Sequence, residues 1–182
     1  KYKMKKYIII VISFVFVSNI SAQSFGLKGG AAITTFSGSD VKDVDSRTGF
    51  YFGSFMKLGD GNIRYSPEVI FHQKGAIEDT NEIKINYIDI SVNGNFHIND
   101  ELALVLGPYF AYAISGTDNV GSIKDWNIYN KTEFGANIGA TYELNDLLCV
   151  DLRYGLAFSD VKQAQTKKNR SIQIGIGYIF GY

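Results

Sequence analysis

The sequence predicts an all-β protein: an eight-stranded antiparallel up-and-down transmembrane β-barrel, preceded by a cleavable signal peptide. Three observations indicate this fold. After residue 22, apolar and polar residues alternate with a period of two in eight segments. The connections between these segments are alternately short and long. The chain is also rich in aromatic residues and glycine and poor in proline, which favours strands over helices.

Residues 1–22 resemble a signal peptide, and residues 23–182 then form one barrel domain. Lysines precede the apolar run YIIIVISFVFV at 7–17, which is shorter than the roughly 20 residues that a helix needs to cross a bilayer. Small polar residues follow, with Ala22 at the expected cleavage point. Cleavage removes four lysines and no acidic residue, which leaves 14 basic against 18 acidic residues. This excess of acidic charge argues against a nucleic-acid partner.

The segments of alternating residues define the expected strands, which are 25–36, 48–58, 63–75, 83–98, 102–115, 132–144, 147–159 and 169–182. Three connections are tight and contain Asn, Asp or Gly, which tolerate positive φ: GDGN at 59–62, NDE at 99–101 and ND at 145–146. The other four are longer and polar, around 37–48, 77–82, 116–131 and 160–169. Short turns at one end and long loops at the other are typical of outer-membrane barrels. We therefore expect external long loops and periplasmic mature termini.

The two faces of each expected strand differ in side-chain size and charge. On strand 147–159, one face carries Leu148, Val150, Leu152, Tyr154, Leu156 and Phe158, and the other carries Cys149, Asp151, Arg153, Gly155, Ala157 and Ser159. Small residues suit the interior of a narrow barrel, whereas charges facing lipid cost a few kcal/mol each near the bilayer midplane. We expect the polar face to point inward, with a structural network of charges formed by Lys28, Lys57, Arg64, Glu68, Asp89, Asp151 and Arg153.

A soluble lipocalin-like ligand-binding barrel is an alternative, because its strands also alternate. In that fold the apolar face would point inward around a ligand. Charges of both signs on the polar face favour the membrane barrel instead. The Gly-x-Trp pattern of lipocalins is also missing near the first strand, since the single tryptophan, Trp126, lies in an expected long loop.

Several segments in order resemble the PorT-like outer-membrane β-barrel family of Bacteroidetes. These segments are GLKGGAAITTF at 26–36, YSPEVIFHQKGA at 65–76, INYIDISVNGNFHI at 85–98, LVLGPYFAYAISG at 104–116, EFGANIGATYEL at 133–144, LCVDLRYGLAFSDV at 148–161 and RSIQIGIGYIF at 170–180. The resemblance implies an outer-membrane barrel without an established catalytic motif, in a family whose founding member is linked to protein secretion. The aromatic C-terminal strand resembles those that the barrel assembly machinery recognises during insertion.

The resulting functional hypothesis is a non-enzymatic integral protein of the outer membrane, with a structural or interaction role and accessory to protein secretion. Its expected partners are the lipid bilayer, lipopolysaccharide, the assembly machinery, and a secretion-system or surface protein. No catalytic residue, cofactor or metal site is expected. Residues Trp126, Ile128 and Tyr129 offer an external-loop contact, or else cap the barrel mouth. The basic stretch 162–170 either contacts lipopolysaccharide phosphates or is solvated.

A lipid-modifying enzyme is the sharpest rival hypothesis, because such an enzyme needs a histidine paired with a second polar group at the outer leaflet. The expected topology places His72 near the external rim, within reach of Ser159 or Glu133, and His97 at the opposite end. In the alternative without catalysis, His72 is a hydrogen-bonded residue in the barrel interior.

Overall fold

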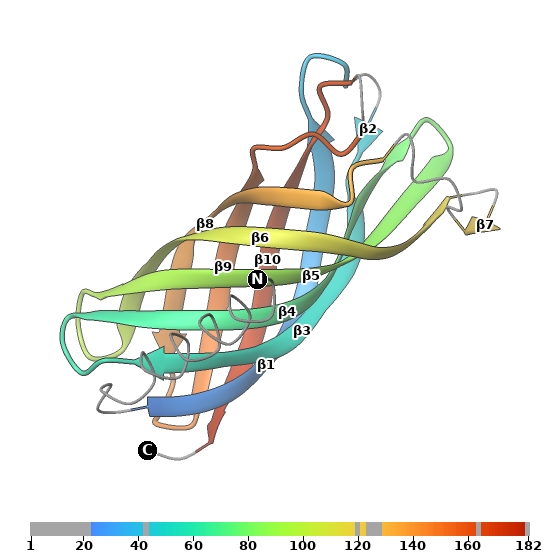
Figure 1. Cartoon of the computed structure of the whole chain (residues 1–182). Helices are drawn as coiled ribbons and strands as arrows, with labels where there is room; N and C mark the ends of the chain where they lie inside the picture. Colours follow the sequence, from blue (N-terminus) through green and yellow to red (C-terminus); the bar gives the residue numbers. More distant parts are fainter. Residues whose placement is uncertain (1–22, 42–43, 119–120, 123–128, 163–164, 181–182) are drawn as a thin grey trace, which may run out of the picture.

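The computed structural model describes residues 23–41, 44–118, 121–122, 129–162 and 165–180. They form one antiparallel sheet that closes on itself into a barrel (Figure 1). The strands are β1 (Gln23–Ser37), β2 (Val44–Asp45), β3 (Arg47–Leu58), β4 (Ile63–Glu78), β5 (Asn81–His97), β6 (Leu102–Asp118), β7 (Gly121–Ser122), β8 (Thr132–Glu143), β9 (Leu148–Ala157) and β10 (Lys168–Phe180). In the described part of the chain, no helix is long and apolar enough to cross a bilayer.

Eight long strands make the wall of the barrel, in agreement with the prediction from the sequence. Their order around the wall is β4-β3-β1-β10-β9-β8-β6-β5, and the pairing of β4 with β5 completes the circle. The first and last strands pair without interruption from Phe25↔Phe180 to Ser37↔Lys168. The short β2 pairs with the end of β4, and the short β7 pairs with the end of β6. Closure leaves no long strand with an unpaired edge. A β-protein in lipid requires this, because no water is present to pair with free backbone N–H and C=O groups.

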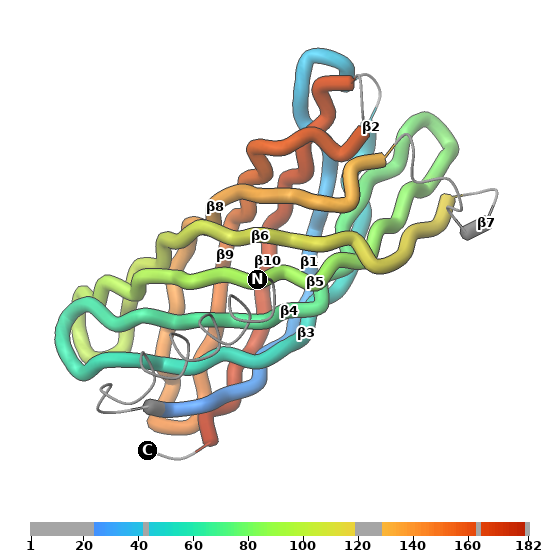
Figure 2. Tube along the Cα trace, viewed as in Figure 1, coloured from blue at the N-terminus to red at the C-terminus, as the bar shows by residue number. Residues whose placement is uncertain are grey.

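The two ends of the barrel differ, as Figure 2 shows along the chain trace. At the turn end lie the three connections 59–62, 98–101 and 144–147, together with the start of β1 and the end of β10. At the loop end lie the long connections 38–46, 119–131 and 158–167.

The predicted loop around 77–82 is wrong. β4 and β5 continue past the predicted strand ends and meet in a two-residue turn, Asp79-Thr80, in which Asp79 has a φ of 54°. The polar residues that suggested a loop belong to a hairpin that extends beyond the apolar part of the wall. The tip of this hairpin, residues 78–82, is polar throughout, so it lacks the period-two signal on which the prediction depended.

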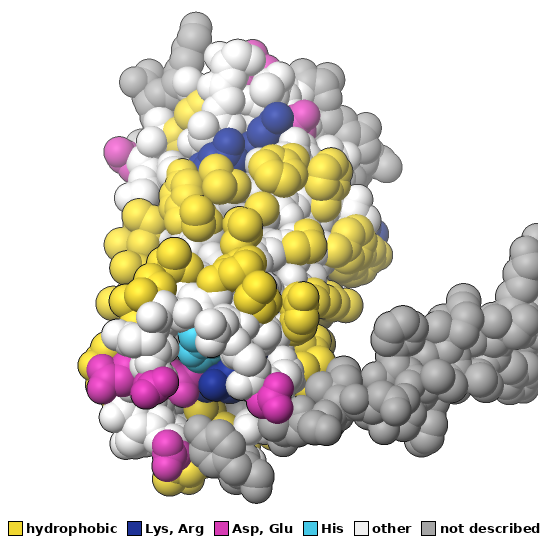
Figure 3. Space-filling model, turned by 90° about the vertical axis from the view of Figure 1, so that its left-hand side faces the viewer, with side chains coloured by type: hydrophobic (Ala, Val, Ile, Leu, Met, Phe, Trp, Pro, Cys, Tyr) yellow, Lys and Arg dark blue, Asp and Glu magenta, His cyan; other side chains and the backbone are white. Residues whose placement is uncertain are grey.

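The apolar side chains lie on the outside of the barrel, so the lipocalin-like alternative is wrong. Every one of the eight long strands contributes exposed large apolar residues, for example Leu27, Phe52, Ile90 and Ile174. They form a belt between two polar rims, and on the face drawn in Figure 3 Lys and Arg side chains lie directly above this belt. A water-soluble protein would not expose an apolar surface of this extent, whereas a bilayer requires it.

Aromatic rings gather near both margins of the belt. Near the turn end, Phe25 stacks on Phe180 with ring centroids 5.9 Å apart. Near the loop end, the ring of Phe71 stacks on that of Phe52 at 5.1 Å. Such girdles are typical of the two interfaces of an outer-membrane barrel.

The two prolines lie where the ladders between strands are interrupted. Beside Pro67, the β3–β4 ladder skips from the pair Phe55↔Glu68 to the pair Leu58↔Tyr65. Beside Pro108, the β5–β6 ladder skips from Ser91↔Tyr109 to Gly94↔Leu106. Since proline has no N–H to donate, these local breaks allow a closed barrel to contain it.

Glycines on the inner face make room for large side chains in the narrow lumen. The buried ring of Tyr51 lies beside the cross-strand pair Gly30↔Gly175. A Cβ added at Gly175 would lie 2.4 Å from the hydroxyl oxygen of Tyr51 and 2.4 Å from the carbonyl oxygen of Gly29. The small residues of β10 therefore determine how closely the wall packs against the side chains in the lumen.

We expect Gly175→Val to destabilise the folded barrel by about 1–3 kcal/mol, because the added atoms overpack the lumen against Tyr51 and the β1 backbone. The urea midpoint of the refolded protein in lipid vesicles measures this. Gly61→Val is the matched control, since a Cβ at Gly61 meets nothing within 4 Å. Equal midpoints for the two variants would contradict the packing argument.

Candidate functional site

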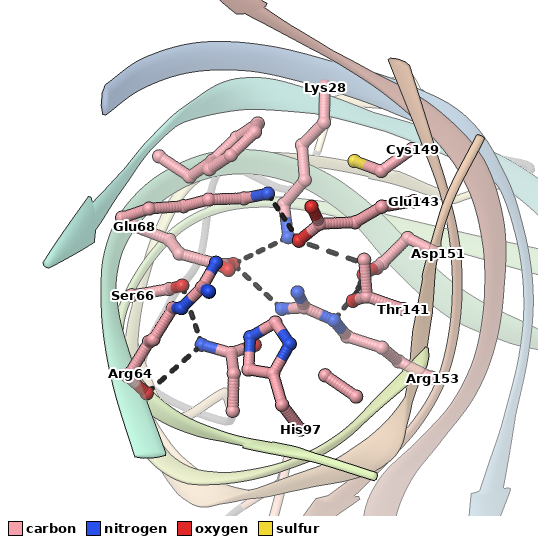
Figure 4. Close-up of a pocket in the computed structure, with 14 residues that line it drawn as sticks. Lys28, Arg64, Ser66, Glu68, His97, Thr141, Glu143, Cys149, Asp151 and Arg153 are labelled. Atoms are coloured by element: carbon pink, nitrogen blue, oxygen red, sulfur yellow. Dashed lines mark hydrogen bonds and ion pairs between the residues drawn. The ribbon is translucent and has the colours of Figure 1, made fainter. Parts of the chain in front are cut away.

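Charged side chains in the barrel lumen form a turn-end network of Lys28, Glu68, Asp151 and Arg153. The ammonium nitrogen of Lys28 lies 2.7 Å from Glu68 Oε2, and Arg153 Nη1 lies 2.8 Å from the same oxygen. Arg153 Nε lies 2.7 Å from Asp151 Oδ1. Figure 4 shows these side chains converging from opposite walls of the barrel. Two cations and two carboxylates thus neutralise each other inside the barrel.

This network arises from strand alternation and barrel closure together. Each residue occupies an inward position of its strand, and β1, β4 and β9 are brought around a common axis by the closed sheet. Thr141 on β8 adds a hydrogen bond from its hydroxyl to Asp151 Oδ2 at 2.9 Å. The Lys28 and Glu68 side chains are only 5% and 2% exposed, so each charge depends on its partners rather than on water.

A second group, the loop-end network of His72, Lys74, Asp89 and Glu133, fills the lumen nearer the other end. Lys74 Nζ lies 2.9 Å from Asp89 Oδ2 and 2.8 Å from Glu133 Oε1. His72 Nδ1 lies 3.1 Å from Asp89 Oδ2. The Tyr109 hydroxyl and the Asn169 amide both donate hydrogen bonds to Glu133. Lys74 also lies over the Tyr109 ring, 4.6 Å from its centroid.

The structure separates the seven charges that the sequence analysis assigned to one interior network. It brings together Lys28, Glu68, Asp151 and Arg153, while Asp89 lies in the loop-end network. Lys57 pairs instead with Glu143, at 2.7 Å. Arg64 makes no ion pair with a described carboxylate, and its buried Nε has no hydrogen-bond partner there.

Sequence reasoning did not assign Lys74, Glu133 and Glu143 to the interior network. The signal was present, since Lys74 continues the inward alternation of Arg64, Glu68 and His72 on β4. Glu133 and Glu143 lie on the same polar face of β8 as Gly135 and Asn137. Lys74 and both glutamates lie close to expected strand ends, where the facing of a residue is hardest to infer.

An apolar cap cluster lies in the lumen at the loop end. It consists of Phe36, Ala76, Ile83, Ile85, Tyr87, Tyr109, Ala111, Ala113, Tyr129 and Val161. Tyr129 is 6% exposed, and its backbone bridges to Lys162 of the β9–β10 connection. Burial raises the pKa of the Tyr129 hydroxyl, as do the nearby carboxylates of Asp118 and Glu78. Of the three predicted loop-contact residues, Tyr129 therefore faces the protein, and Trp126 and Ile128 lie outside the described residues.

The turn-end mouth of the lumen contains only a small hollow. Its lining includes Lys57, Arg64, His97, Glu143 and Cys149, some of which are labelled in Figure 4. The space between these side chains is about 20 Å³, which suffices for roughly one water molecule. An organic substrate does not fit in such a space.

His72 does not have the surroundings that a lipid-modifying site requires. Its side chain is 1% exposed and lies inside the barrel, bonded to Asp89. Glu133 belongs to the same network, because Lys74 forms ion pairs with both Glu133 and Asp89. Ser159 instead accepts a hydrogen bond from the backbone N–H of Phe134 at the wall. Among the described residues, no group of three or more His, Cys, Asp and Glu side chains could hold a metal ion.

Comparison with known proteins identifies the family. The model of the outer membrane protein beta-barrel domain matches residues 21–163. The chain belongs to this family. It is therefore an integral barrel protein of the outer membrane, in agreement with the localisation predicted from the sequence. No curated protein sequence matches the chain.

Solved structures share the barrel fold of this outer-membrane protein. Neisserial surface protein A is 14% identical, with a TM-score of 0.63, and the match covers 88% of this chain and 100% of that one. Ail, the attachment invasion locus protein of Yersinia pestis, is 16% identical, with a TM-score of 0.56 and the same coverage. At these identities the likeness extends to the fold alone.

We expect Arg153→Ala to destabilise the barrel by about 3–5 kcal/mol, because Glu68 and Asp151 would remain buried with only Lys28 between them. Heat-modifiability on gels and the urea midpoint both report this loss. The matched control is Lys84→Ala, whose side chain is 39% exposed and whose ion pair with Glu82 is screened by solvent. The double variant Glu68→Gln/Arg153→Met should recover part of the loss, and the absence of any difference between Arg153→Ala and Lys84→Ala would contradict the role of the network.

Proposed function

We propose that this protein is a non-enzymatic barrel with a structural or interaction role in the outer membrane, accessory to protein secretion. The observation that carries the proposal is the filling of the lumen. Two ion-pair networks and the apolar cap cluster occupy the interior, and their polar groups are bonded mainly to one another. The outer wall and the loop end are then the surfaces left for lipid and partners.

The proposed role in secretion depends on the resemblance of the segments between residues 26 and 180 to the PorT-like barrels of Bacteroidetes. A secretion accessory of this kind would act by contact, as an anchor or docking partner, because a side-chain-filled barrel of eight strands has no room for a polypeptide to pass.

The proposed orientation places the loop end outside the cell and both mature termini in the periplasm, after removal of residues 1–22 as a signal peptide. The long connections 38–46, 119–131 and 158–167 support it, since outer-membrane barrels carry short turns on the periplasmic side. In this orientation Trp126 and Ile128 belong to an external connection that could contact a surface or secretion partner.

The orientation predicts which epitopes are accessible on whole cells. A peptide epitope inserted between Asn119 and Val120 should be labelled by antibody and cleaved by added proteinase on intact cells, because it lies in a loop-end connection. The same epitope inserted in the 98–101 turn is the control and should become accessible only after the outer membrane is broken. Labelling of the turn insertion alone would reverse the orientation.

The filled lumen predicts that the purified barrel conducts no current. In planar bilayers we expect no large ohmic steps, because residues from opposite walls meet in the lumen and the hollow at its turn-end mouth has room for about one water molecule. A large porin inserted in the same bilayer provides the positive control. Regular steps that scale with salt concentration would overturn the proposal of a non-conducting barrel.

A further inference from the structure

Two basic residues on β10 point outward at the loop-end margin of the apolar belt. Lys168 and Arg170 occupy the same face of the strand as Ile172, Ile174 and Ile176, which belong to the belt. Their neighbours at positions 167, 169 and 171 are buried in the lumen. The positive charges therefore lie on the surface that lipid covers, next to its polar boundary.

Neither of these cations has a carboxylate partner among the described residues, which distinguishes them from the basic residues around them. Arg47 and Lys84 share Glu82, while Lys162 and Lys167 share Glu78. One guanidinium nitrogen of Arg170, Nη1, donates to two carbonyl oxygens, those of Ala157 and Asn169, both at the end of the wall. These bonds hold the guanidinium in place and leave its charge without a counterion from the described protein.

A groove runs beside Arg170 on the outer wall. It is lined by apolar side chains on the belt side and by hydroxyls on the loop side: Ile33, Tyr154 and Ile172, then Thr35, Ser37 and Ser46. Its volume is about 470 Å³. Strand pairing fixes its shape, since Ile33 lies opposite Ile172 and Thr35 opposite Arg170 across the β1–β10 seam.

We propose that this groove binds a phosphorylated membrane lipid of the lipid A type. An acyl chain would lie against Ile33, Tyr154 and Ile172, and a phosphate would lie against Arg170. Lys168 does not line the groove, but it lies on the same face of β10 opposite the lining residue Ser37 and adds positive charge beside the phosphate. Arg and Lys are the usual partners of phosphate, and the hydroxyls of Thr35 and Ser46 can donate to its remaining oxygens. Apolar side chains lie on the belt side of the groove, and the hydroxyl and cationic groups lie together on its loop side, since Thr35 is paired with Arg170 and Ser37 with Lys168. This division matches the acyl chain and the phosphorylated headgroup of such a lipid.

In the cell, the proposed orientation determines which leaflet supplies the lipid to the groove, and this proposal rests on the proposed function only in that respect. In nanodiscs both leaflets can present the lipid, so binding there is independent of orientation. Failure of the epitope experiment and failure of lipid binding are therefore separate results.

The test is retention of lipid A by the folded barrel, counted by native mass spectrometry after release from nanodiscs of phosphatidylcholine with a minor fraction of lipid A. We expect the natural sequence to retain lipid A and to prefer it over dephosphorylated lipid A. Arg170→Gln should lower the relative affinity about fivefold, and Arg170→Gln/Lys168→Gln by more, since one basic residue near a membrane surface contributes a factor of this size.

Lys84→Gln is the matched control, because it removes the same charge from the loop end but from a side chain that has its own carboxylate. It should retain lipid A like the natural sequence. Heat-modifiability checks that each variant is folded. If Arg170→Gln does not fold, the comparison between phosphorylated and dephosphorylated lipid A on the natural sequence still decides the proposal.

Two results would overturn it. One is equal retention of lipid A by Arg170→Gln/Lys168→Gln and Lys84→Gln. The other is displacement of lipid A by millimolar inorganic phosphate, which would indicate an anion site without a role for the apolar half of the groove.

Discussion

Closure of the sheet between β1 and β10 is the constraint on which the rest of the structure depends. A strand in lipid cannot leave its N–H and C=O groups unpaired, because no water is present to replace the missing hydrogen bonds. The continuous pairing from Phe25↔Phe180 to Ser37↔Lys168 removes the last edge. Once the wall is closed, each strand must send alternate residues into a lumen of fixed width, and this determines which residues can occupy it.

The narrow lumen explains both the glycines and the ion pairs of the inner face. Gly175 leaves space for Tyr51, while long charged side chains reach across the axis to partners on other strands. Burying these charges is costly unless each is matched, and the turn-end network matches two cations with two carboxylates. The apolar cap cluster fills the loop end, where the hairpin of β4 and β5 extends beyond the belt.

A filled lumen moves the functional surfaces to the outside of the barrel. The chain belongs to a family of outer-membrane barrels, and its filled lumen leaves the loop end and the outer wall available for contacts. On that wall, Lys168 and Arg170 differ from the neighbouring Lys162 and Lys167, because no described carboxylate forms an ion pair with them. Their position at the margin of the belt links the proposed lipid site to the same closing seam that holds the barrel together.

The period-two pattern by itself determined the positions of the long strands, because alternation is local to one strand. Together with the charges on the polar face it determined which face of each strand meets lipid, and the alternation of short and long connections indicated the barrel. Asn, Asp and Gly indicated the tight turns. The period-two pattern failed at 77–82, because the tip of the hairpin, residues 78–82, is polar throughout. Which inward charges meet was decided only by the tertiary structure. Arg153 and Glu68 are 85 positions apart, and Lys57 faces Glu143 rather than the turn-end network. Such contacts depend on the stagger between strands when the sheet closes, a quantity that no single strand contains.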